Sequence, residues 1–113
     1  MTTKKEISDC FANLRKYGYT VMNFNSQKQL IRGIKGFTDF LIVGAGHLYF
    51  IEVKIGKDRF SPEQQAFKIE IQYAAERNPF VFYIECNENN YKDIHEYILS
   101  NNYKKLKQTT IKN

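Results

Sequence analysis

Two apolar runs separated by a short glycine-containing connection constrain the fold of this chain more than any other feature. Phe37 to Val43 and Leu48 to Lys54 are rich in aromatic and β-branched residues, which favours strands. The four residues between them, Gly44-Ala45-Gly46-His47, are few enough to reverse the chain directly. We therefore predict an antiparallel hairpin whose two strands lie side by side in a sheet.

A helix is predicted soon after this hairpin. Ser61 is a typical N-cap, Pro62 suits the first helical position, and Gln64 completes a capping box. The apolar periodicity continues to about Arg77. Phe80 to Glu85 then forms a short apolar run suited to a buried strand, so the helix should join two parallel strands by a right-handed crossover.

The rest of the chain adds elements on both sides of this unit. Periodicity and breaker residues predict a helix at 4–17, a strand at 19–24, a polar basic loop at 25–36 and a helix from about 91 to 98. Residues 1–100 should thus form one α/β domain, with the order α-β-β-β-α-β-α and a mixed β-sheet flanked by helices. Residues 101–113 are polar and lysine-rich, which predicts a frayed, basic C-terminal tail.

Composition bears on the binding partners and on the cellular compartment of the protein. A net charge of +5 favours polyanionic partners, although it also fits an ordinary basic protein. Cys10 and Cys86 have no metal-ligand spacing, which indicates neither a zinc site nor a disulfide framework and fits a reducing cytoplasm. No apolar run approaches the ~20 residues of a membrane helix, so we expect no membrane association.

Three charged residues on the hairpin form a candidate site. Glu52 and Lys54 alternate with Val53 and so share one face of their strand, and the partner strand can bring Asp39 within reach. Two carboxylates suit Mg²⁺, and a lysine beside them could act as a base or stabilise charge on a phosphate. A solvated polar strand face would show the same pattern.

The wider context resembles a known family. Glu6, Gly36-x-x-Asp39, Glu52-x-Lys54 and Ser61-Pro62-x-Gln64 resemble, in order and spacing, the VRR-NUC branch of the PD-(D/E)xK nuclease superfamily. The resemblance extends from Glu6 to Ile84 and implies a restriction-endonuclease-like core. One departure is Thr38, where family members usually have a proline before the aspartate.

The resemblance implies a role for each matching residue. It makes Asp39, Glu52 and the carbonyl of Val53 ligands of Mg²⁺ or Mn²⁺, and it makes Lys54 the catalytic lysine. Gln64 would face the site from its helix, and Glu6 would reach the site from the first helix. Each of the last two has a structural alternative: a capping box explains Gln64, and the helix dipole favours Glu6.

Basic residues flank the proposed site and are candidates for phosphate contacts. They are Lys28, Arg32, Lys35, Lys57 and Arg59. A solvated charged surface is the alternative for each of them.

The resemblance implies a metal-dependent DNA endonuclease, similar to Holliday-junction resolvases and working as a homodimer on branched or duplex DNA. Such an enzyme would act in the cytoplasm of a bacterial or phage-infected cell. Two alternatives remain open: a non-catalytic DNA-binding or partner-binding module with the same fold, and a repair or restriction nuclease that cuts duplexes or flaps.

Overall fold

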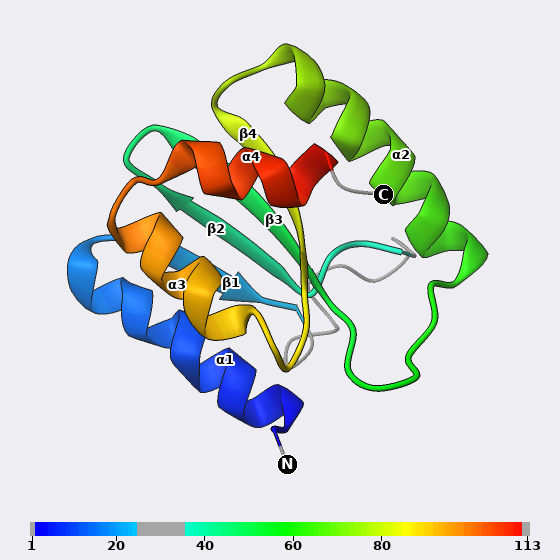
Figure 1. Cartoon of the computed structure of the whole chain (residues 1–113), viewed down its shortest axis with the longest axis horizontal. Helices are drawn as coiled ribbons and strands as arrows, with labels where there is room; N and C mark the ends of the chain where they lie inside the picture. Colours follow the sequence, from blue (N-terminus) through cyan, green and yellow to red (C-terminus); the bar gives the residue numbers. More distant parts are fainter. Residues whose placement is uncertain (1, 25–35, 112–113) are drawn as a thin grey trace.

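The computed structural model describes residues 2–24 and 36–111, arranged as Figure 1 shows. In chain order the elements are α1 (Lys4–Ala12), the 3-10 helix η1 (Asn13–Tyr17), β1 (Thr20–Asn23), β2 (Phe40–Gly44), β3 (His47–Val53), α2 (Pro62–Arg77), β4 (Val81–Cys86), α3 (Tyr91–Leu99) and α4 (Tyr103–Ile111).

The strands form one mixed sheet in the order β1-β2-β3-β4. β1, β2 and β3 pair antiparallel, whereas β4 runs parallel to β3. Both the predicted hairpin and the predicted parallel crossover through α2 are confirmed. The hairpin turns at Ala45 and Gly46, whose φ angles of 53° and 81° are typical of a two-residue type I′ loop. β2 begins at Phe40, three residues later than predicted, so Asp39 lies just before the strand.

The two faces of the sheet pack against different helices. One face joins α1, α3 and α4 in the main hydrophobic core, which includes Ile7, Phe11, Ile42, Tyr49, Ile51, Phe82, Ile84, Ile94, Ile98 and Leu106. On the other face, Phe50 and Phe37 lie against Phe67 of α2. Figure 1 shows α2 away from α1 and α3, and α4 approaches it through the hydrogen bond from Lys107 to the Ala75 carbonyl. The candidate site lies on the α2 face.

The N-terminal helix is divided. The sequence predicts a single helix from Lys4 to Tyr17, but α1 ends at Ala12 and the chain continues as the tighter η1. Gly18, with φ of 92°, then ends the helical segment as predicted.

The prediction of a frayed tail is wrong for most of its length. α4 occupies Tyr103–Ile111, and Leu106 is fully buried in the main core. The Nζ atom of Lys107 donates hydrogen bonds to the carbonyls of Ala75, Asn78 and Val81 at 2.5, 3.0 and 2.6 Å. Leu106 and Lys107, together with Tyr103, which also packs against the core, hold this polar segment against the domain.

None of the helices in the described part of the chain combines the length and the apolar character that a membrane crossing requires.

Candidate active site

Asp39 directly precedes β2, at the end of the sheet where β3 finishes. The register pairs Phe40 with Ile51, so one step further Asp39 stands opposite Glu52. Asp39 Oδ2 accepts a 2.6 Å hydrogen bond from the Val53 amide. The N–H and C=O of one residue in an extended strand point to the same side, so the Val53 carbonyl also faces the Asp39 side. Asp39 and Glu52 thus lie close enough to interact, and strand geometry directs the Val53 carbonyl to the same side.

Glu52 is the buried acid of the site, with only 2% of its surface exposed. Its pKa is raised to about 8, chiefly by burial and then by the charge of Asp39 and a hydrogen bond with it, whereas Lys54 opposes the shift. Glu52 Oε2 accepts a 3.1 Å hydrogen bond from Gln64 Nε2 and lies 3.7 Å from Lys54 Nζ. The carboxyl group therefore sits between a second acid and two compensating donors.

Lys54 is held by oxygen acceptors. Its Nζ atom donates to Gln64 Oε1 at 2.8 Å and to the Arg59 carbonyl at 3.0 Å, and it lies 4.8 Å from the centre of the Phe60 ring. The side chain is 19% exposed, so the ammonium group lies at the border between the protein and solvent. Lys54 can reach a ligand without leaving the site.

Gln64 serves the helix and the site together. Ser61 caps α2 through the Gln64 amide at 3.1 Å, and Gln64 Oε1 accepts from the Ser61 amide at 2.9 Å. The same side chain contacts Glu52 and Lys54. The capping box and the predicted position facing the site are therefore both observed in one side chain.

Gly36 explains how the segment before Asp39 meets α2. Its φ is +83°, and a Cβ atom built on it would lie 2.3 Å from the Glu63 carbonyl carbon and oxygen. Only a residue without a side chain allows so close an approach. The glycine thus brings the Asp39 segment against the helix turn that carries Gln64.

Not every predicted residue meets the site. The Glu6 carboxylate accepts from the amide and hydroxyl of Thr3 and so caps its own helix, with no contact to Asp39, Glu52 or Lys54 among the described interactions. Lys57 and Arg59 are exposed beside Lys54, as expected for flanking basic residues. The remaining basic candidates, Lys28, Arg32 and Lys35, lie outside the described residues.

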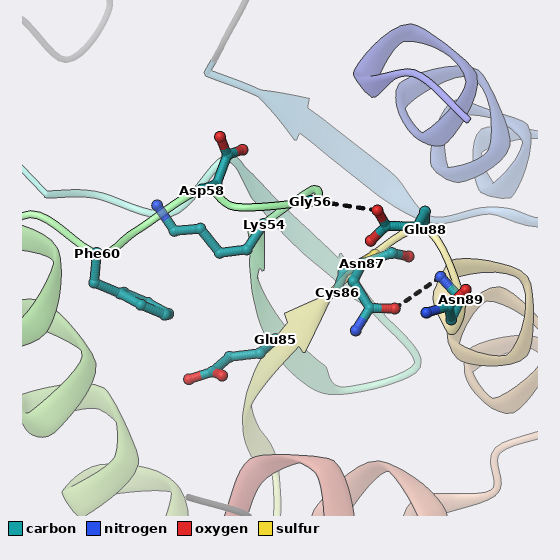
Figure 2. A pocket seen from close by; sticks show the side chains of 9 residues that line it. All are labelled: Lys54, Gly56, Asp58, Phe60, Glu85, Cys86, Asn87, Glu88 and Asn89. Atoms are coloured by element: carbon teal, nitrogen blue, oxygen red, sulfur yellow. Dashed lines mark hydrogen bonds between the residues drawn. The ribbon is translucent and has the colours of Figure 1, made fainter. Parts of the chain in front are cut away.

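Two charged residues that the sequence did not single out lie beside the site. Glu85 on β4 is in register with Glu52 on β3, and it pairs with Lys68 of α2 at 2.6 Å. Glu85 and Lys54 also line a pocket of about 580 Å³ with Phe60, and Figure 2 shows their side chains extending toward α2. The sequence did contain a signal for Glu85. The predicted parallel crossover places β4 next to β3 and so brings the acidic end of β4 near Glu52.

The oxygen donors present suit a hard divalent cation, but they are few. Two carboxylates and one carbonyl match the preference of Mg²⁺ for oxygen ligands, with water completing its coordination. Over residues 2–24 and 36–111, no group of three or more His, Cys, Asp or Glu side chains gathers as a metal site. The donor chemistry fits, and most of the coordination would fall to water and substrate.

A scan of family models and searches of curated proteins and of solved structures found no match to this chain.

Proposed function

We propose that this chain is a metal-dependent DNA endonuclease with a restriction-endonuclease-like core, and that it hydrolyses phosphodiester bonds. The observation that carries the proposal is the setting of Glu52: a buried carboxyl group beside Asp39, hydrogen-bonded to Gln64 and close to Lys54. Burying an acid next to another acid lowers stability, and such perturbed groups concentrate at functional sites. A purely structural position would favour an apolar residue here.

Asp39, Glu52 and the Val53 carbonyl would hold Mg²⁺ or Mn²⁺. When bound, such a cation lowers the pKa of a water molecule and neutralises charge on the scissile phosphate. The protein's own contribution is rigid placement: the Val53 amide fixes Asp39, and Gln64 fixes Glu52. Preorganised groups of this kind need no rearrangement when charge develops.

The contacts of Lys54 favour a charge-stabilising role over that of a base. Its Nζ atom donates to two oxygen acceptors and lies near a carboxyl group, an arrangement that suits an ammonium ion. A partly exposed ammonium group can donate to a phosphate oxygen as negative charge builds up there. Lys57 and Arg59, exposed in the same loop, would add contacts to neighbouring phosphates.

The substrate is proposed from the family resemblance. Branched DNA, with the Holliday junction as the leading case, would be cut by a homodimer, because two symmetric cuts need two sites and this domain offers one. A duplex or flap substrate would use the same chemistry. The net charge of +5 suits any of these polyanions.

Cleavage assays on DNA of different shapes test the proposal. Purified protein is incubated with labelled four-way junction, flap, duplex and single strand, each with Mg²⁺, Mn²⁺ or EDTA. We expect metal-dependent cleavage, and we expect Asp39→Asn and Lys54→Met to lower its rate at least about a hundredfold. Asp93→Asn and Lys16→Met are matched controls, because both residues are exposed outside the site. Absence of cleavage on every substrate with either metal would sink the proposal.

A non-catalytic DNA-binding module is the second candidate, and one observation favours it. Fewer than three ligand side chains gather at the site within the described residues, which suits weak or absent metal binding. This candidate predicts that the wild type binds junction DNA equally well in EDTA and in Mg²⁺ and leaves it uncut.

Sedimentation of the free protein separately tests the proposed dimer.

A further inference from the structure

Three carboxylates occupy one row across the sheet. Glu52 on β3 stands opposite Asp39 on one side and is in register with Glu85 of β4 on the other. Residues in register on parallel strands share a face, and neighbouring strands lie about 4.8 Å apart. A divalent cation held by Asp39 and Glu52 would therefore have a third carboxylate one strand away.

Lys68 forms an ion pair with that third carboxylate, Glu85. It follows Gln64 by four residues, so the two side chains lie on one face of α2. Gln64 contacts Glu52 at 3.1 Å, and Lys68 Nζ lies 2.6 Å from Glu85 Oε2. Successive turns of the helix thus bind neighbouring members of the row, one through an amide and the other through an ammonium group.

Phe60 lies near both lysines of this region. Lys54 Nζ and Lys68 Nζ each lie 4.8 Å from the centre of its ring. The Lys68 side chain is 16% exposed and that of Glu85 is 32% exposed, so their ion pair is better shielded from solvent than an ordinary surface pair. Lys68 Nζ thus contacts both the Phe60 ring and the Glu85 carboxylate.

We propose that Lys68 is a positioning residue that withholds Glu85 from the metal site, so that Asp39 and Glu52 are the only carboxylates that bind the cation. This inference rests on the proposed function, because it concerns the same metal. A hard cation attracts any free carboxylate within reach, and an ammonium group in contact with Glu85 competes for it. Lys68 thereby limits both the number of protein ligands and the negative charge of the site.

Calorimetric titration of the DNA-free protein with Mn²⁺ tests this role without any activity assay. Lys68→Met frees Glu85, so we expect Mn²⁺ to bind about tenfold more tightly than to the wild type. Lys68→Arg keeps the ion pair and should bind like the wild type. Adding Glu85→Gln to Lys68→Met should return the affinity to within about twofold of the wild type.

Several results would overturn the inference. One is an unchanged Mn²⁺ affinity in Lys68→Met. Another is a double variant that binds as tightly as Lys68→Met, because the lysine charge would then act directly on the metal. If Lys68→Met fails to fold, Glu85→Gln alone still tests the inference. Weaker Mn²⁺ binding in Glu85→Gln than in the wild type would show that Glu85 is already a ligand, which contradicts the inference. Any of these results in the variants leaves the proposed function standing. A wild type that binds no Mn²⁺ without DNA also overturns the inference, whereas the cleavage assays decide the proposed function, because substrate would supply part of the coordination there.

Discussion

Glu52 is an acidic side chain in surroundings that oppose its ionisation. It is almost completely buried, and its pKa is raised to about 8 by that burial and by Asp39. Lys54 and Gln64 offset part of this cost by contacting the carboxyl group. A pKa of about 8 would leave this carboxyl group largely protonated at neutral pH in the metal-free protein.

The stability of the metal-free protein should fall as the pH rises from about 4.5 to 8. The folded pKa of Glu52 lies above the ordinary value of 4.5, so the folded state holds its proton over this window while the unfolded state releases it. Linkage then gives a loss of up to ~1.4 kcal/mol per pH unit from this group. Chemical denaturation in EDTA at pH 5, 6, 7 and 8 measures the slope.

Glu52→Gln is the control for this effect, since its amide keeps the shape but does not titrate. The difference in unfolding free energy between the wild type and Glu52→Gln should change with pH over the same window. A constant difference would contradict the assignment of the slope to Glu52. Mutating the exposed Glu63 to Gln gives a matched variant whose pH dependence should follow the wild type.

At the scale of elements, the contact between Gly36 and the first turn of α2 decides how the Asp39 segment is placed. Gly36→Ala should destabilise the protein by more than about 2 kcal/mol, because the new Cβ atom would overlap the Glu63 backbone. Urea denaturation measures the loss.

Gly46 provides a close control for that substitution. Its φ of +81° nearly equals that of Gly36, but among the described residues, its two chain neighbours aside, no atom lies within 4 Å of the place that a Cβ atom would take. Gly46→Ala should therefore cost only the backbone strain, about 1 kcal/mol. Equal losses in the two variants would show that the contact with α2 contributes nothing.

The elements that sequence reasoning predicted best are those with local signals. Ser61, Pro62 and Gln64 specify the start of α2 by their own hydrogen-bonding chemistry, and glycine in the connection specifies the hairpin. Glu85 could not be recognised in the same way, because its importance depends on the register between two strands that a helix separates. Glu6 shows the opposite problem: one local pattern, an acid in the first turn, fits a cap and a site equally well.

At the scale of the whole molecule, α4 extends the main core to the C-terminal part of the chain. Its sequence is typical of a solvated segment because Tyr103, Leu106 and Ile111 are separated by lysines and other polar residues, which leaves too few apolar residues for a clear helical stripe. The helix is stabilised instead by the packing of Leu106 in the main core. Leu106→Ala should therefore lower the global unfolding free energy by about 2–5 kcal/mol in one cooperative transition.

Equilibrium urea unfolding, followed by fluorescence and circular dichroism together, measures that loss. Lys104→Ala is the control, since Lys104 is exposed on the same helix and should change stability by less than about 0.5 kcal/mol. A Leu106→Ala protein as stable as the wild type would show that α4 does not belong to the cooperative unit.

The shared oxygen of Gln64 has a consequence for motion. Amide oxygens carry two lone pairs; here one acceptor direction serves the Ser61 amide and another serves Lys54. If Lys54 swings toward a passing phosphate, it gives up one of these bonds while the helix start keeps the other. Lys54 is thus bound to Gln64 but is not needed for the cap of α2. Its movement leaves the hydrogen bonds of the first helical turn intact.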